Sequence, residues 1–231
     1  MPLIIPLLLF VATIGITRYF AGRFETACKR GARENAPMAR TGAEIAQMFL
    51  ASEGFEDVQV VEHNGVVTDY YDSKRKRLFL RPEVANGTTM IAWAIALHEA
   101  AHAPQTESSK GDLLWRQTCI RMARYGPVFL GIGLITASFL KVLPVRMALI
   151  GFAVVMAIFA ALNIGTLAIE FNANARVRKF LERHLDLKDS ARERLESLLP
   201  GVASKEVGDL LRSPRFFFFS ALPGSTKVRP Q

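Results

Sequence analysis

The sequence predicts an α+β membrane protein that is mostly helical, with a small antiparallel sheet and three transmembrane helices. Two observations predict this class. Half of the 231 residues are hydrophobic and the formal net charge is +8, a combination typical of a membrane protein with basic flanks. Three apolar runs are also long enough to cross a bilayer, and short alternating stretches lie between the first and the second. The basic residues lie on no recognisable nucleic-acid-binding motif, so we expect no nucleic-acid partner.

The first apolar run, residues 1–20, predicts an N-terminal transmembrane anchor. A cleaved signal peptide carries its positive charge before the apolar region. Here the basic residues follow that region, at Arg18, Arg23 and Lys29. The positive-inside rule then places the N-terminus outside the cell membrane.

Two further apolar runs, residues 126–143 and 147–169, predict a transmembrane helical hairpin that turns around Pro144. Basic residues are more frequent beyond the two outer ends of this hairpin than in its turn. The positive-inside rule therefore places residues 18–125 and 170–231 in the cytoplasm. A buried hairpin of a soluble protein is the alternative, but apolar runs of this length are rare in soluble helices.

A short α/β segment is predicted between the first and second spans. Residues 41–44 read T-G-A-E, which fits a capping box at the start of a helix. Alternating stretches at residues 58–61 and 66–71 flank Asn64-Gly65, a strong hairpin signal. Together with a third stretch, residues 78–80, they predict a small antiparallel sheet.

The most informative motif is H-E-x-x-H, formed by His98, Glu99 and His102. It lies in an apolar run that predicts a buried helix over about residues 88–103, and Pro104 favours an end to this helix. Histidines at positions i and i+4 lie one turn apart on one helix face. This spacing lets two imidazoles bind one Zn²⁺ ion while the glutamate faces a water molecule on the metal.

A third metal ligand is predicted at Glu170. A catalytic zinc ion usually has three protein ligands, but the next histidine after the motif is His184, too far along the chain for a short-spaced motif. Glu170 ends the third apolar run, on the same predicted side of the membrane as the motif. A carboxylate in that position is costly unless it is paired or bound to a metal. The alternative is an ordinary charge at a helix end, hydrated at the membrane surface.

These motifs together resemble the YugP-type neutral zinc metallopeptidases of bacterial membranes. Residues 98–105 resemble the HExxGHAxQ pattern of that family, with Ala101 where glycine is usual. Three further elements are similar: residues 41–46 to T-G-x-E-x-A, residues 69–72 to D-H-Y-D with Tyr70 in place of histidine, and residues 170–174 to E-F-D-A-S with Asn172 in place of the acidic residue. The resemblance covers residues 1 to about 185.

The resemblance implies a zincin-like, gluzincin-type cytoplasmic domain in which the two histidines and Glu170 bind zinc and Glu99 is the general base. It implies a membrane-anchored, zinc-dependent endopeptidase that acts on peptide or protein substrates. Tyr71 is predicted to stabilise the oxyanion because of its place in the family-like element, and His63 is the next candidate. The alternative function is a membrane interaction or scaffold protein with a structural or degenerate zinc site, which would have four protein ligands.

The chain therefore divides into five predicted parts. They are the anchor at residues 1–20, a cytoplasmic part at residues 21–125 with the H-E-x-x-H helix, the transmembrane hairpin at residues 126–169, cytoplasmic helices at residues 170–215 with the third ligand, and a C-terminal tail at residues 216–231. The apolar part of the tail is too short to span a bilayer, so we expect it at the membrane interface.

Overall fold

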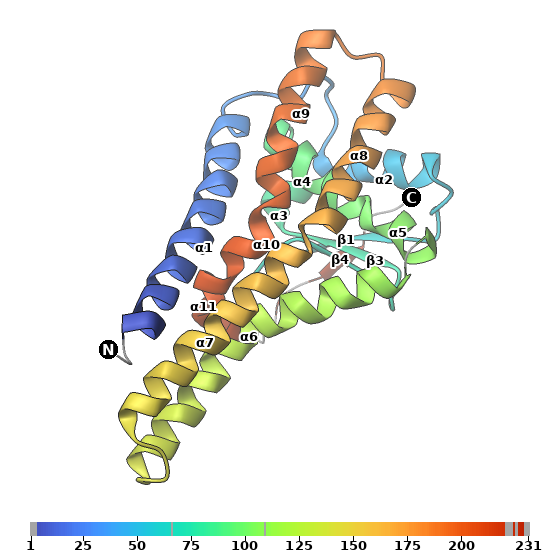
Figure 1. The fold of residues 1–231 in the computed structure, drawn as a ribbon. Helices are drawn as coiled ribbons and strands as arrows, with labels where there is room; N and C mark the ends of the chain where they lie inside the picture. The colour runs from blue at the N-terminus through green and yellow to red at the C-terminus, as the bar shows by residue number, and fades with distance from the viewer. Residues whose placement is uncertain (1–3, 66, 109, 220–223, 225, 229–231) are drawn as a thin grey trace.

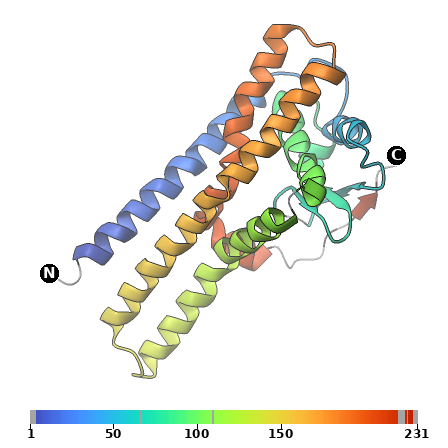
Figure 2. The same ribbon diagram turned by 45° about the vertical axis from the view of Figure 1, so that its right-hand side comes forward.

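The computed structural model describes residues 4–65, 67–108, 110–219, 224 and 226–228. Most of these residues are helical, and the long helices extend to one end of the molecule, away from a small sheet (Figure 1). After a 45° turn the hairpin of α6 (Lys110–Phe139) and α7 (Val145–Gly165) still extends beyond the sheet (Figure 2). The molecule therefore has a helical, apolar end and a mixed α/β end.

Three helices are long and apolar enough to cross a membrane, which confirms the three predicted apolar helices. They are Ile4–Gly31, Gly111–Phe139 and Val145–His184. The first two correspond to α1 (Ile4–Gly31) and α6 (Lys110–Phe139). The third comprises α7 (Val145–Gly165) and α8 (Leu167–His184), which are separated by a turn at Thr166. Large hydrophobic side chains face outward on the hairpin, with Ile135 72% and Phe139 84% exposed, as a lipid environment requires.

The helix that carries the histidine motif, α4 (Met90–Ala100), is buried at every position. Its first turn is capped by Thr89, whose hydroxyl accepts a hydrogen bond from the Ala92 amide at 3.3 Å. The prediction that Pro104 ends the helix is wrong. The chain breaks instead after α4, and Pro104 lies in the first turn of α5 (His102–Ser108), where a missing N–H breaks no helical hydrogen bond.

Helix α2 (Gly42–Ser52) confirms the predicted capping box. The Thr41 hydroxyl accepts from the Glu44 amide at 3.3 Å, and the Glu44 carboxylate accepts from the Thr41 amide at 2.7 Å. Gly42 lies so close to the next segment that a Cβ atom there would be 2.3 Å from the Val84 carbonyl oxygen of α3 (Pro82–Ala85). This close approach lets α2 pack against α4.

The sheet is mixed, so the prediction of an antiparallel sheet is wrong. Its strands are β1 (Gln59–His63), β2 (Tyr70–Asp72), β3 (Arg77–Leu80) and β4 (Thr226–Val228), in the order β2-β3-β1-β4. The β2 and β3 strands form an antiparallel hairpin, and β4 is antiparallel to β1. Strands β1 and β3 are parallel.

The predicted hairpin at Asn64-Gly65 does not form, because neither side of β1 is available to residues 67–71; residue 66 of the predicted stretch lies outside the described residues. One side of β1 pairs with β3 and the other with β4. The Asn64-Gly65 turn is instead closed by His63, whose Nδ1 accepts from the Gly65 amide at 2.9 Å. Asp69, just before β2, instead holds the chain next to Arg81, just after β3. Its carboxylate accepts hydrogen bonds from the Arg81 amide at 2.7 Å and from the Arg81 guanidinium at 2.9 Å.

The C-terminal helices return along α1 and close the core. They are α9 (Asp189–Ala203), α10 (Lys205–Gly208), the short 3-10 helix η1 (Asp209–Arg212) and α11 (Ser213–Phe219). Strand β4 was not foreseen in the predicted tail at residues 216–231. Residues 220–222 lie outside the described residues, and the placement of this tail at the membrane interface stays a prediction.

Candidate metal centre

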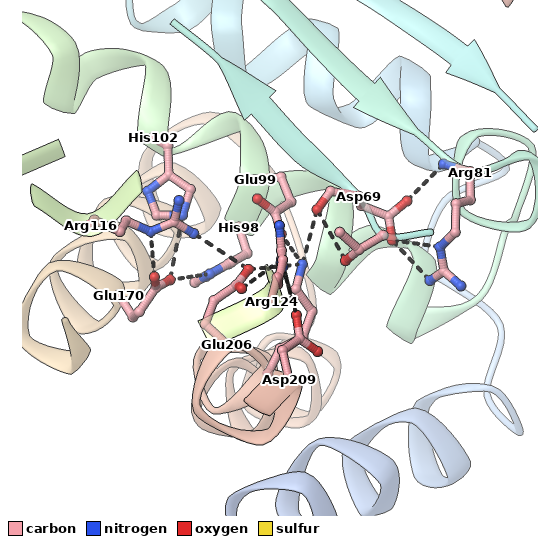
Figure 3. A network of polar contacts seen from close by, with 12 residues as sticks. Asp69, Arg81, His98, Glu99, His102, Arg116, Arg124, Glu170, Glu206 and Asp209 are labelled. Atoms are coloured by element: carbon pink, nitrogen blue, oxygen red, sulfur yellow. Dashed lines mark hydrogen bonds and ion pairs between the residues drawn. The ribbon is translucent and has the colours of Figure 1, made fainter. Parts of the chain in front are cut away.

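Three helices bring His98, His102 and Glu170 together. The histidines come from α4 and α5 and the glutamate from α8, and all three side chains are at most 2% exposed. Glu170 Oε2 lies 2.9 Å from His98 Nε2 and 3.5 Å from His102 Nε2. The three potential ligand atoms all lie within 4.8 Å of one another. The two histidines and the predicted third ligand therefore meet at one point (Figure 3).

The distances between these donors fit a zinc ion. Donors about 2.0–2.1 Å from one tetrahedral zinc ion lie roughly 3.3 Å apart, and the measured separations of 2.9 and 3.5 Å fall on either side of that value. Both ring nitrogens of His98 also face acceptor oxygens, because Nδ1 lies 2.8 Å from Asn174 Oδ1. A divalent cation between Nε2 and the Glu170 carboxylate would satisfy both atoms. Imidazole nitrogen and carboxylate oxygen are both ligands that zinc accepts.

Two amide side chains orient the histidines. Asn174 donates its Nδ2 hydrogen to the Leu199 carbonyl at 3.0 Å, so its Oδ1 is left to accept from His98 Nδ1. Gln105 Nε2 donates to the Asn172 side chain at 3.0 Å, so the Gln105 oxygen accepts from His102 Nδ1 at 2.8 Å. With Nδ1 donating in both rings, each Nε2 is directed to the metal position, as in many metal sites of proteins.

The surroundings of His102 favour its neutral form. Its Nε2 is buried and makes no hydrogen bond in the described part of the chain. Burial and the positive charge of Arg116 lower the pKa of His102, so its imidazole is neutral at pH 7. The neutral imidazole leaves Nε2 as a potential metal-ligating atom.

Glu99 lies beside the two histidines but does not belong to the three-ligand group. Its Oε1 forms a buried ion pair with Lys205 Nζ of α10, and its Oε2 has no hydrogen-bond partner among the described residues. Burial raises the pKa of Glu99, but Lys205 and the histidines lower it by more, so the net shift is downward. Glu99 is therefore a carboxylate with one anchored and one unpartnered oxygen.

A chain of buried charges continues away from the ligands (Figure 3). Arg116 of α6 contacts Glu170 Oε1, the carboxylate oxygen not directed at the histidines. It also lies 3.8 Å from Glu206, which Arg124 contacts at 2.6 Å. Arg124 in turn contacts Asp209 at 3.0 Å. Sequence reasoning missed these residues as part of the site, since it used the basic residues before the second span only to orient the membrane hairpin.

The other predicted site residues lie at different places. Tyr71 of β2 is 5% exposed and lines an open cavity together with Arg116. His63 closes a turn at the end of β1, and His184 is exposed at the end of α8, where it stacks on Phe180. Neither histidine belongs to the ligand group.

The fold and the site together define a mostly helical protein with helices apolar enough to cross a membrane and a buried group of potential metal ligands, His98, His102 and Glu170. A family profile described as "Putative neutral zinc metallopeptidase" matches residues 6–211, and the chain belongs to this family. The chain is also 27% identical over 213 residues to the "Putative membrane protease YugP" of Bacillus subtilis (strain 168), a match that covers 89% of this chain and 90% of that protein. The resemblance drawn from the motifs is thereby confirmed. No solved structure matches the chain.

Proposed function

We propose that this protein is a membrane-anchored zinc endopeptidase whose active site faces the cytoplasm. The observation that carries the proposal is the group formed by His98, His102 and Glu170, with the unpartnered Oε2 of Glu99 beside it. The family description and the membrane protease of Bacillus subtilis support the same class of activity. The substrates would be peptides or proteins that reach the site from the cytoplasm.

In the proposed mechanism, zinc would be held by the two histidines and Glu170. When bound, it would acidify a water molecule and polarise the scissile carbonyl. Glu99 takes a proton from the water through its Oε2 and passes it to the leaving amine, while Lys205 holds Oε1 in place. Tyr71 is the proposed hydrogen-bond donor to the oxyanion, from the wall of the neighbouring cavity.

Strand β2 provides a place for an extended substrate. It is an edge strand of the described sheet, and Tyr70, Tyr71 and Asp72 line the cavity beside α6. A free strand edge can pair with an extended peptide through main-chain hydrogen bonds. We therefore propose that the substrate backbone lies along β2.

A scaffold protein with a structural zinc site is the rival function. Structural zinc sites usually have four protein ligands, whereas a catalytic site leaves one position for water. The group found among the described residues has three members, which favours the peptidase.

The test uses the purified full-length protein in detergent, loaded with zinc. We expect Glu99→Gln to keep its zinc, measured by elemental analysis, and to cleave an unfolded protein substrate roughly 10²- to 10⁴-fold more slowly than the unchanged protein. The exposed Glu182→Gln of α8 serves as the matched control and should retain activity. Cleavage by Glu99→Gln at the unchanged rate would contradict the proposed mechanism.

A further inference from the structure

The cavity beside the metal centre has a volume of about 460 Å³ and lies between β2 and α6. This volume falls in the range of about 300–1,000 Å³ that is usual for ligand sites. Three side chains, Arg116, Arg124 and Glu206, belong to both the cavity wall and the buried charge network. Arg116 contacts the metal ligand Glu170, and Glu206 lies 3.5 Å from Lys205, the partner of Glu99. The cavity is therefore separated from the metal centre by one layer of side chains.

Basic residues predominate in the lining of this cavity. Five of the lining residues are basic and two are acidic. We call it the basic cavity; its charged lining residues are Lys74, Arg75, Arg116, Arg121, Arg124, Asp72 and Glu206. The lining also includes Tyr70, Tyr71, Tyr125 and Phe216, which give it aromatic surface.

The charge of the basic cavity is only partly neutralised by the protein itself. Arg116 and Arg124 are paired with buried carboxylates of the network. Lys74 and Arg121 are exposed, and among the described residues no acidic side chain forms an ion pair with either of them. Arg75 has one distant partner, Asp72 at 3.9 Å. Positive charge at the mouth of the cavity is thus left for a ligand to neutralise.

We propose that the basic cavity binds an acidic segment of the peptide substrate, whose carboxylates contact Lys74, Arg75 and Arg121. The inference rests on the proposed function and names its substrate class. Arginine binds carboxylate in a bidentate, charge-assisted geometry, and the aromatic wall provides contact for the remainder of the segment. A peptide is the occupant favoured over a lipid headgroup, because Lys74 and Arg75 come from the β2–β3 turn, next to the edge strand β2 along which the substrate backbone is proposed to lie.

The first experiment measures binding without cleavage. Zinc-loaded full-length Glu99→Gln protein is titrated with fluorescent peptides that share one central sequence and carry either Asp and Glu or Asn and Gln on the flanks. We expect the acidic peptide to bind about tenfold more tightly, since two or three partly exposed charge pairs are gained. The difference should shrink as the salt concentration rises. Equal affinity for the two peptides would overturn the proposal.

The second experiment tests whether the basic cavity causes the preference for the acidic peptide. In the Glu99→Gln background, the double change Lys74→Glu and Arg121→Glu should abolish or reverse the preference for the acidic peptide. The matched control, Lys179→Glu with Arg183→Glu, makes the same charge change on exposed positions of α8 outside the cavity and should leave the preference intact. A loss of preference in both double variants would mean that net charge alone attracts the peptide and would overturn the proposal.

Two further outcomes separate this inference from the proposed function. If the unchanged protein cleaves both peptides at equal kcat/KM, the peptidase assignment stands and the acidic preference is wrong. If it cleaves neither, the peptidase assignment fails, while the binding titration still reports on the cavity. Binding of vesicles that contain anionic phospholipid, lost in the Lys74 and Arg121 variant while neither peptide binds, would assign the cavity to lipid and overturn the proposal.

Discussion

Lys205 and Glu99 form a buried ion pair that links α10 to α4, the helix that carries His98. Lys205 is 4% exposed and also donates to the Asp69 carbonyl oxygen at 3.0 Å. Burial lowers the pKa of Lys205, but Glu99 and Glu206 raise it by more, so the lysine is charged. The pair leaves Oε2 as the oxygen of Glu99 that can accept a proton. A side chain from the C-terminal helices thus orients the proposed general base.

We predict that Lys205→Met destabilises the protein and lowers its activity without removing zinc. Loss of one partner leaves a buried carboxylate without its cation, which costs about 3–5 kcal/mol. The melting temperature in detergent should fall, kcat should fall more than KM changes, and the zinc content should be unchanged.

A double variant provides the control for this prediction. Glu99→Gln combined with Lys205→Met has no charge on either side, so it should be more stable than Lys205→Met alone. The comparison of the two single variants with the double variant gives the coupling energy of the pair. A coupling energy of zero would show that Lys205 and Glu99 do not interact.

The parts of the site that follow from local sequence could be predicted. Histidines at i and i+4 are expected about one helical turn apart, so His98 and His102 could be paired from spacing; they still meet although the chain breaks between α4 and α5. Glu170 could be found because a carboxylate at the end of an apolar run needs a partner. The capping box of Thr41 and Glu44 depends only on neighbouring residues and also formed as predicted.

The parts that depend on long-range contacts could not be predicted. Lys205 meets Glu99 across 106 positions of the chain, and nothing near either residue indicates the other. The one available signal was a charged pair, Lys205-Glu206, next to an apolar helical stretch. The hairpin predicted at Asn64-Gly65 is likewise absent because of long-range contacts: the distant strands β3 and β4 pair with β1.

We predict that the two amides that orient the histidines increase zinc affinity. Asn174→Leu or Gln105→Leu removes the acceptor for one Nδ1 hydrogen, and loss of such partners typically weakens metal binding about 10- to 100-fold. Competition with a chromophoric chelator measures the affinity. Asn172→Asp keeps an acceptor for Gln105 Nε2 and is the control that should retain affinity. Unchanged affinity in both leucine variants would contradict the assigned role.

Asp209 predicts a pH-dependent stability. Burial raises its pKa from 3.8 to about 6, in spite of the neighbouring Arg124. The folded state therefore keeps the proton between about pH 4 and pH 6, where the unfolded state has lost it, so the free energy of unfolding falls as the pH rises through this window. A shift of about two units corresponds to about 3 kcal/mol.

The corresponding experiment follows thermal unfolding of Asp209→Asn in detergent between pH 4.5 and 7. As the pH rises through this window, the stability of the variant should fall much less than that of the unchanged protein. Glu206 contributes little in this window, because its pKa is lowered to about 2 and its stabilising effect is lost only as the pH falls below about 4.5. A fall of equal size in the variant would assign the effect to another group.

The predicted orientation can be tested with single cysteines in a background where Cys28 and Cys119 are replaced by serine. Arg146→Cys lies exposed in the first turn of α7, next to the hairpin turn, and Glu182→Cys lies exposed on α8, beyond the third apolar run. With the N-terminus outside, a membrane-impermeant maleimide added to intact cells should label position 146 and should label position 182 only after the membrane is permeabilised. The reverse pattern would put Glu170 and the histidines outside the cytoplasm and restrict the substrates to proteins on that side.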